Sequence, residues 1–345
     1  MPKVLYIAAW GRSGTTLLDN ILDACPHVFS AGEMFYLWRR GLKQKRRCGC
    51  GVPFPECPLW TKIRSVAFGR DEPRPREVLA LQARFARARH ATRRGEPKDP
   101  DEKRYRAIMA RLYQAIAEVT RAQLVVDSSK SPAGAALLSE LDGVEPYLVH
   151  MVRDPRAVAH SWNRAKAGLD RQTESLMRQH GAWKSSVQWV ARNALIERVA
   201  RTYGHRQQRV RYEDFMAEPL ATVRSLLTLA GVAAECDTFT DDHVVELGVN
   251  HTISGNPSRF RTGQVQLRPD DLWRADQSNR DRAVATSVAL PLLHRYGYQV
   301  RVKSAQQERA VAPESSAPPR EWRIPAQPQP GQPAARRTPR GDQPD

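Results

Sequence analysis

The chain has 345 residues, of which 41% are hydrophobic, enough to bury the core of one large domain with insertions or of two small domains. Its formal net charge of +17 favours anionic ligands and allows peripheral contact with an anionic membrane, but the sequence has no recognisable nucleic-acid-binding motif, so no nucleic-acid partner is expected. It shows no signal peptide and no apolar run near the ~20 residues of a membrane span, which predicts a cytoplasmic protein without a transmembrane segment.

The first predicted element is a buried strand that runs into a glycine-containing loop. Residues 4–9 are apolar with β-branched members, as is typical of a central parallel strand, and a helix is predicted to begin at Thr15. The N–H groups at such a helix start form an anion site, and Arg12 in the loop G-R-S-G (11–14) offers a planar fork of donors to a tetrahedral oxyanion. The loop differs from the standard nucleotide-triphosphate loop, which has four residues between its glycines and a Lys before the Ser/Thr.

The segment 34–75 has the composition of an insertion, with aromatic residues, a basic run and three cysteines. The cysteines are Cys48, Cys50 and Cys57. Their C-x-C spacing, with no nearby His, differs from the paired spacing of zinc sites, so we expect a lid shaped by Gly and Pro, without a metal. A cystine in this loop is the alternative, although a reducing cytosol disfavours it.

The rest of the chain alternates helices with short apolar strands. Strands are predicted at 123–127, 146–152 and 208–212, and helices at 75–121 with a polar break, at 133–141, from Pro155, at 180–202 and from 213 to about 230. This alternation predicts a three-layer α/β/α fold with a central parallel sheet, in which ligands bind at the carboxyl ends of the strands. Beyond residue 303 the chain is rich in Pro, Gln, Ala and Arg, so we expect one domain over 1–303 and a disordered tail over 304–345.

Cationic residues follow three of these strands. Arg12 follows the first, Lys130 lies in D-S-S-K-S-P after the second, and Arg153 follows the third. Ser161 comes eight residues after Arg153, a spacing that lets both meet one anion. Two separate phosphate-binding sites indicate a ligand in which a nucleoside carries phosphate groups at both ends.

These motifs resemble those of the sulfotransferases that use 3′-phosphoadenosine 5′-phosphosulfate (PAPS), over residues 3–300. They are more similar to the Golgi-type, tyrosylprotein-like and bacterial-type enzymes than to the cytosolic branch, and R-Y-E-D-F (211–215) also resembles a family segment. The resemblance implies a P-loop-like sulfotransferase fold, with a 3′-phosphate site at Arg153 and Ser161. It implies a 5′-phosphosulfate loop that comprises Arg12, Ser13, Gly14, Thr15 and Thr16.

The resemblance also implies the catalytic residues. Glu33 takes the position of a general base that accepts the proton of the attacking acceptor, unless it merely pairs with a neighbouring Arg. Lys130 takes a position beside the oxygen that bridges sulfur and phosphate, where a fixed cation stabilises the developing charge. No metal is implied. A cover over the nucleotide is assigned to 251–265, a stretch that an ordinary polar loop also explains, with polar contacts from Asn256, Arg259 and Arg261.

Two other functions stay open. Asp127 superficially resembles the Mg²⁺-holding Asp of a small-molecule kinase that uses ATP, although the loop lacks the kinase Lys. A non-catalytic protein that binds PAPS or its product is the second alternative. If the chain is an enzyme, the segments 34–75 and 165–185 are expected to form the acceptor pocket, and their aromatic and basic residues suit a hydroxyl-bearing or amine-bearing glycan, lipid or secondary metabolite.

Overall fold

The computed structural model describes residues 1–88, 91, 95–164 and 179–301. Its centre is a five-stranded parallel sheet in the order β2-β3-β1-β4-β5. The strands are β1 (Lys3–Ala9), β2 (Val28–Gly32), β3 (Leu124–Lys130), β4 (Glu145–Val152) and β5 (Gln207–Arg211). The predicted α/β class with a parallel sheet is confirmed, and β2 is the one strand of this sheet that the sequence does not predict.

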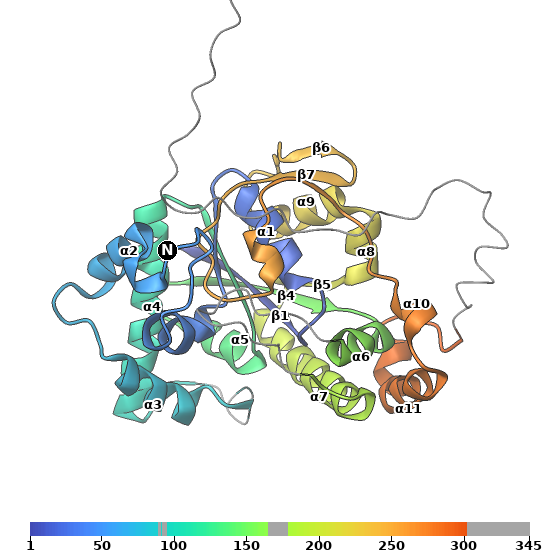
Figure 1. Ribbon diagram of the computed structural model, residues 1–345. Coiled ribbons are helices and arrows are strands. Elements are labelled where there is room, and N and C mark those ends of the chain that lie inside the picture. Colours follow the sequence, from blue (N-terminus) through green and yellow to red (C-terminus); the bar gives the residue numbers. More distant parts are fainter. Residues whose placement is uncertain (89–90, 92–94, 165–178, 302–345) are drawn as a thin grey trace, which may run out of the picture. The chain divides into compact units, whose positions relative to one another are not determined.

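Helices cover both faces of the sheet because successive residues of the strands point to opposite sides. On β1, Val4 and Tyr6 are buried in one core, whereas Leu5 and Ile7 are buried in the other. The first core includes residues of α2 (Pro58–Phe68), α4 (Pro100–Thr120), α5 (Pro132–Leu138) and α7 (Ala182–Ala200). The second includes residues of α1 (Thr15–Ala24), α8 (Tyr212–Ala217) and α9 (Pro219–Leu229). Figure 1 shows α1, α8 and α9 above the sheet and α5 and α7 below it.

The remaining elements surround this three-layer centre. Helix α6 (Pro155–Asn163) follows β4 with Pro155 in its first turn, as predicted, and packs against α7 and α11 (Asn279–Arg295). A small antiparallel sheet is formed, in this order, by β6 (Phe239–Asp241), β7 (Val244–Leu247) and β8 (Gly263–Gln266). Other elements are α3 (Pro75–Phe85), α10 (Trp273–Asp276), and the short helices η5 (Arg201–Tyr203) and η6 (Pro257–Phe260).

The segment 34–75 is helical over much of its length and packs into the core. The sequence predicts a lid at its cysteine loop, but Cys48 and Cys57 of that loop are buried in the core. It contains η1 (Met34–Tyr36), the π-helix η2 (Leu37–Lys43), η3 (Phe54–Glu56) and α2. Trp38, Phe54 and Trp60 are fully buried in the same core as α4. Most of the aromatic surface of this segment therefore stabilises the fold and is not available to an acceptor.

The edge strand β2 is extended by a segment far along the chain. The Glu33 N–H donates to the Ile253 carbonyl at 2.7 Å, and the Ile253 N–H donates to the Ala31 carbonyl at 2.9 Å. Gly32, at φ 71°, lies so close to this segment that a Cβ would sit 2.6 Å from the Ile253 nitrogen. The glycine thus permits the approach that brings residues near 253 beside Glu33.

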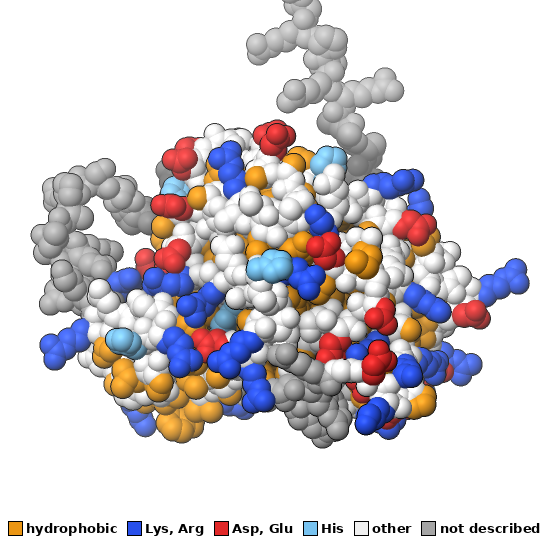
Figure 2. All heavy atoms as spheres, turned by 180° about the vertical axis from the view of Figure 1, so that it is seen from behind, with side chains coloured by type: hydrophobic (Ala, Val, Ile, Leu, Met, Phe, Trp, Pro, Cys, Tyr) orange, Lys and Arg blue, Asp and Glu red, His pale blue; other side chains and the backbone are white. Residues whose placement is uncertain are grey.

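Basic side chains are dispersed over one face of the molecule. On the face drawn in Figure 2, Lys and Arg side chains lie scattered among acidic ones and do not gather into one patch. This face therefore shows no single basic binding surface.

Two predictions concern residues outside the described ranges. The tail 304–345 lies there, and so does most of the predicted acceptor segment 165–185. Of the helices in the described ranges, none is long and apolar enough to cross a membrane.

A disulfide bond joins Cys25, at the end of α1, to Cys236, after α9. Both residues are buried, and 211 positions separate them in the sequence. The sequence does not predict this pair. Disulfides are rare in a reducing cytosol, so the redox state of this pair bears on the predicted cytoplasmic location.

Replacing Cys25 and Cys236 together by serine is expected to lower the free energy of unfolding by about 2–4 kcal/mol, because the bond closes a long loop in the unfolded chain. Chemical denaturation of the wild type and of the double variant measures the difference in the free energy of unfolding. In a non-reducing peptide map of the wild type, the two cysteine peptides should run as one linked species. Recovery of both cysteines as free thiols from unfolded, unreduced protein would contradict the bond.

Candidate active site

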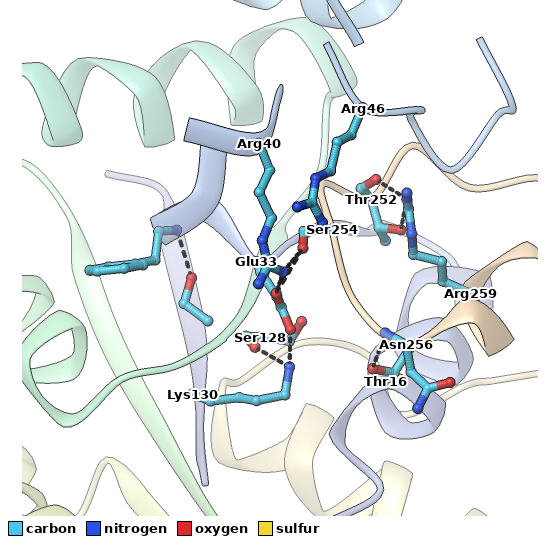
Figure 3. Close-up of polar contacts among 12 residues, drawn as sticks. Thr16, Glu33, Arg40, Arg46, Ser128, Lys130, Thr252, Ser254, Asn256 and Arg259 are labelled. Carbon is cyan, nitrogen blue, oxygen red and sulfur yellow. Dashed lines mark hydrogen bonds and ion pairs between the residues drawn. The ribbon is translucent and has the colours of Figure 1, made fainter. Parts of the chain in front are cut away.

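A cavity of about 730 Å³ lies at the carboxyl ends of the strands. Glu33 follows β2, Lys130 ends β3, Arg12 follows β1 by three positions, and Arg153 follows β4; all four line the cavity. The four strands are neighbours in the sheet, so the parallel topology brings these charged residues to one edge. Figure 3 shows Glu33 between Lys130 on one side and Arg40 and Ser254 on the other.

The glycine-containing loop is shaped to present its backbone to the cavity. Gly14 has φ 84°, and a Cβ there would lie 2.5 Å from the Tyr212 ring, so only glycine fits. Thr15 and Thr16 form the first turn of α1, where the N–H groups have no partner inside the helix. The Gly11 carbonyl accepts a hydrogen bond from the Trp162 indole at 3.2 Å. The loop is therefore held in place by its neighbours with its helix dipole directed at the cavity.

Glu33 is buried and surrounded by donors. One carboxylate oxygen accepts a hydrogen bond from the Lys130 ammonium. The other accepts from Arg40 at 3.2 Å and from the Ser254 hydroxyl at 2.9 Å. Burial raises the pKa of Glu33, but the charges of Lys130 and Arg40 and the hydrogen bonds outweigh it, so the pKa lies below its ordinary value. Glu33 is accordingly ionised at neutral pH, as a proton acceptor must be.

Two cationic residues of the site, Arg12 in the loop and Lys130 at the end of β3, have unusual backbone conformations. Arg12 has φ 73° and Lys130 has φ 67°, in the left-handed region that side chains with a Cβ seldom occupy. Such conformations cluster at functional sites, where the surrounding structure enforces them. The Arg12 guanidinium lies 5.0 Å from the centre of the Trp162 ring, and burial lowers the pKa of Arg12.

Arg153 is only 5% exposed and connects three parts of the site. Its guanidinium donates to the Arg12 carbonyl at 3.2 Å and to the Asp270 carbonyl at 2.6 Å, and it lies 3.4 Å from the Asp270 carboxylate. The Tyr212 ring packs 4.3 Å from the guanidinium carbon. Ser161 is buried in α6 and lines the same cavity. An anion bound by Arg153 would thus either replace the Asp270 carboxylate as the partner of the guanidinium or bind beside it.

The segment that follows β7 contributes two of the three residues predicted for the nucleotide cover. Asn256 and Arg261 line the cavity, and the Asn256 N–H donates to the Thr16 hydroxyl at 3.3 Å. Arg259 does not line the cavity. It is 1% exposed, and its guanidinium donates to the carbonyls of Thr252 and Arg47, both at 2.6 Å, so it stabilises the segment itself.

Ser13 is the other predicted residue whose side chain turns away from the cavity. Its hydroxyl donates to the Trp10 carbonyl at 2.8 Å, within the loop. The other predicted site residues line one cavity, and they are Arg12, Gly14, Thr15, Thr16, Glu33, Lys130, Arg153, Ser161, Asn256 and Arg261.

Sequence reasoning places the segments of some site residues but not their contacts. Tyr36 and Arg40 line the cavity and lie in the segment 34–75, which the sequence assigns to the acceptor pocket. Ser254 lies in the predicted cover and, like Arg40, contacts Glu33. Neither contact has a distinguishing spacing in the sequence.

Trp162 and Arg192 also line the cavity, and sequence reasoning misses them. Their positions depend on how separate elements pack together, so no local pattern could have identified them.

Asp127, the residue that suggested a kinase, faces away from this cavity. Its carboxylate accepts hydrogen bonds from the Tyr113 hydroxyl at 2.6 Å and from the Ser129 N–H at 2.9 Å. Burial raises the pKa of Asp127 to about 6, against these hydrogen bonds. The side chain is thus bound into the core and does not reach the loop where a phosphate-bound Mg²⁺ would lie.

Comparison with solved structures finds several of similar architecture. The sulfotransferase domain from the curacin biosynthetic pathway is 17% identical, with a TM-score of 0.49 over 87% of this chain and 99% of that chain. The sulfotransferase domain from the Synechococcus PCC 7002 olefin synthase is 18% identical, with a TM-score of 0.42 over 86% of this chain and 96% of that one. A sulfotransferase from Alicyclobacillus acidocaldarius is 13% identical, with a TM-score of 0.37 over 87% and 97%.

Comparison with curated proteins finds no match. A family model described as "Sulfotransferase family" matches residues 4–235, a range that begins in β1, includes the loop of Arg12 and the Arg153–Ser161 pair, and ends after α9. This chain therefore belongs to the sulfotransferase family.

Proposed function

We propose that this protein transfers a sulfuryl group from PAPS to a hydroxyl or amine of an acceptor. One observation carries the proposal: Arg12, Glu33, Lys130 and Arg153 follow or end four neighbouring strands and line one cavity. The cations suit the phosphate and sulfate groups of the donor, and the carboxylate suits the proton of the acceptor.

The donor is proposed to lie across the loop. Arg153 and Ser161 bind the 3′-phosphate, and Arg12 with the N–H groups at the start of α1 binds the 5′-phosphosulfate. The residues fit this role, because the buried Arg153 already holds a carboxylate at 3.4 Å and the loop exposes its backbone to the cavity. Asn256 and Arg261 add polar contacts from the segment after β7.

Glu33 and Lys130 have different roles in the proposed transfer. Glu33 takes the proton of the acceptor as the acceptor oxygen or nitrogen bonds to sulfur. Lys130 stabilises the bridging oxygen, which leaves with the 3′-phosphoadenosine 5′-phosphate as its bond to sulfur breaks. The Lys130 charge is the strongest of the influences that lower the pKa of Glu33. When Lys130 turns to the donor, burial raises the pKa of Glu33, and the carboxylate becomes a better base.

Transfer from PAPS is expected to proceed at the same rate when Mg²⁺ is omitted and EDTA is added just before the assay. Arg12 and Lys130 supply the positive charge beside the loop, and Asp127 is bound to Tyr113 and Ser129. The rate of PAPS consumption, with and without Mg²⁺, measures this. Loss of transfer in EDTA that Mg²⁺ alone restores would favour the kinase alternative.

A binding protein without turnover is the second alternative, and consumption of PAPS distinguishes it. The direct experiment is transfer of labelled sulfate from PAPS into a cell extract, followed by mass spectrometry for products heavier by one sulfuryl group. Label that never leaves PAPS, in protein that binds the product nucleotide, would refute transfer and leave binding intact.

The acceptor is proposed to be an amphipathic glycan, lipid or secondary metabolite. This class suits the side chains that line the cavity beside Glu33, which include Phe35, Tyr36 and Arg40.

A cytoplasmic location stays a prediction. The redox state of Cys25 and Cys236 in protein isolated from its native cells tests it, because a reducing cytosol keeps such thiols free.

A further inference from the structure

Three cysteines and a histidine meet outside the candidate active site. The ligand atoms of Cys48, Cys50, Cys57 and His251 all lie within 4.8 Å of one another. The His251 Nδ1 atom lies 3.3 Å from the Cys57 sulfur and 3.8 Å from the Cys48 sulfur. The sulfur atoms of Cys50 and Cys57 are 3.8 Å apart. None of the four residues lines the cavity that holds Glu33.

The three separations of 3.3–3.8 Å are close to the edges of a tetrahedral metal site. Zinc bonds of about 2.3 Å to sulfur and about 2.0 Å to nitrogen place neighbouring ligand atoms roughly 3.5–3.8 Å apart. The sequence argues against zinc because no His lies near the cysteines, but the fold supplies His251 from 194 positions beyond Cys57. We propose that Cys48, Cys50, Cys57 and His251 bind a zinc ion as its four protein ligands.

The chemistry of the cluster favours a structural zinc site over the other uses of cysteine. The three cysteines are free thiols, and Cys48 and Cys57 are fully buried, so no substrate reaches them. Thiolate and imidazole ligands select zinc over Mg²⁺ and Ca²⁺, which prefer oxygen. Four protein ligands leave no open position for a water or substrate, which is the arrangement of a structural site.

The surrounding backbone holds the four ligands in place. The Cys48 N–H donates to the Val52 carbonyl at 2.8 Å, which closes the turn that carries Cys50. The Trp60 indole donates to the His251 carbonyl at 2.7 Å. Such outer contacts orient metal ligands.

The proposed zinc ion would join the segment 48–57 to the chain that completes the active site. His251 lies three positions before Ser254, whose hydroxyl donates to Glu33. Two positions beyond Ser254, the Asn256 N–H donates to the Thr16 hydroxyl. Backbone bonds already run between these segments, since the Gly49 N–H donates to the Thr252 carbonyl at 3.1 Å. The metal would therefore fix the position of Ser254 against Glu33 from a distance, without contacting substrate.

The metal content of the intact chain tests the site directly. Protein expressed with zinc in the medium is expected to carry about one zinc ion per chain by plasma mass spectrometry. Replacement by Co²⁺ should give thiolate-to-cobalt charge-transfer bands and the intense visible bands of tetrahedral cobalt. Cys48, Cys50 and Cys57 should resist alkylation until a chelator is added. These readouts need no turnover, so they succeed or fail independently of the proposed sulfuryl transfer.

Matched variants identify the ligands. Cys50→Ser and His251→Ala should each lower zinc content and change the cobalt spectrum, whereas His205→Ala, at an exposed histidine, should leave both as in the wild type. Wild-type protein that is folded by circular dichroism yet takes up neither zinc nor cobalt would overturn the proposal, even if the variants fail to fold. A Cys50–Cys57 disulfide in the native protein would overturn it as well.

Discussion

Replacing Glu33 with glutamine is expected to lower turnover by about 10²–10⁴-fold, because glutamine keeps the shape of the side chain and cannot accept a proton. Affinity for 3′-phosphoadenosine 5′-phosphate should be retained or rise. In the ligand-free protein Lys130 is paired with Glu33, and the variant releases that cation for the nucleotide. Steady-state transfer from PAPS and calorimetric binding of the product nucleotide measure the two effects.

The control for this variant is Glu118→Gln, at an exposed position on α4, which should change neither quantity. Thermal unfolding of Glu33→Gln shows whether Lys130 and Arg40, left without their common partner, destabilise the fold. Near-normal turnover of a folded Glu33→Gln enzyme on its true acceptor would exclude Glu33 as the base. Its ion pairs with Lys130 and Arg40 would then be its whole role.

The pH profile gives an independent view of the same residue. The pKa of Glu33 in the free protein is lowered, so the fraction that is ionised falls only at a pH below the ordinary range of Glu. Because a general base works in its ionised form, kcat/KM should decline as the pH drops through this lowered pKa. The Glu33→Gln variant should lack that decline.

Replacing Arg153 with alanine is expected to weaken binding of 3′-phosphoadenosine 5′-phosphate by about 10- to 100-fold, or roughly 1.5–3 kcal/mol, for the loss of a charge-assisted contact with the 3′-phosphate. Binding of adenosine 5′-phosphosulfate, which has no 3′-phosphate, should change much less. Calorimetry of the wild type and the variant with both ligands gives the loss of affinity for each ligand. Arg268→Ala, at an exposed arginine, is the matched control.

The comparison of ligands matters because Arg153 also donates to the Arg12 carbonyl, at 3.2 Å. If the variant loses affinity for both ligands equally, Arg153 acts by holding the loop, and the 3′-phosphate assignment fails. Equal affinity of the wild type for ADP and for 3′-phosphoadenosine 5′-phosphate would contradict the donor assignment itself and favour a kinase.

The strand β2 shows where sequence patterns become insufficient. Its five residues, V-F-S-A-G, include a serine and two small residues, so they lack the apolar run that marks β1 and β4. The strand pairs in parallel with β3, and Ile253 pairs along its outer edge. The Ser30 N–H and hydroxyl also bond to Asp23 and Asp19 of α1. Glu33 can be assigned from a family resemblance, but its place at a strand end follows only from the folded sheet.

The sequence by itself determined the parallel α/β class, the glycine-containing loop around Arg12, and the positions of Arg153 after a strand and Ser161 in the following helix. Each of these depends on residues a few positions apart, where strand and helix periodicity dictate geometry. Only the tertiary structure decided the contacts between distant residues. Lys130 meets Glu33 across 97 positions, His251 meets Cys57 across 194, and Cys25 meets Cys236 across 211. Such pairs follow from the strand order and from the segment that pairs with the edge of β2, and no local pattern encodes either one.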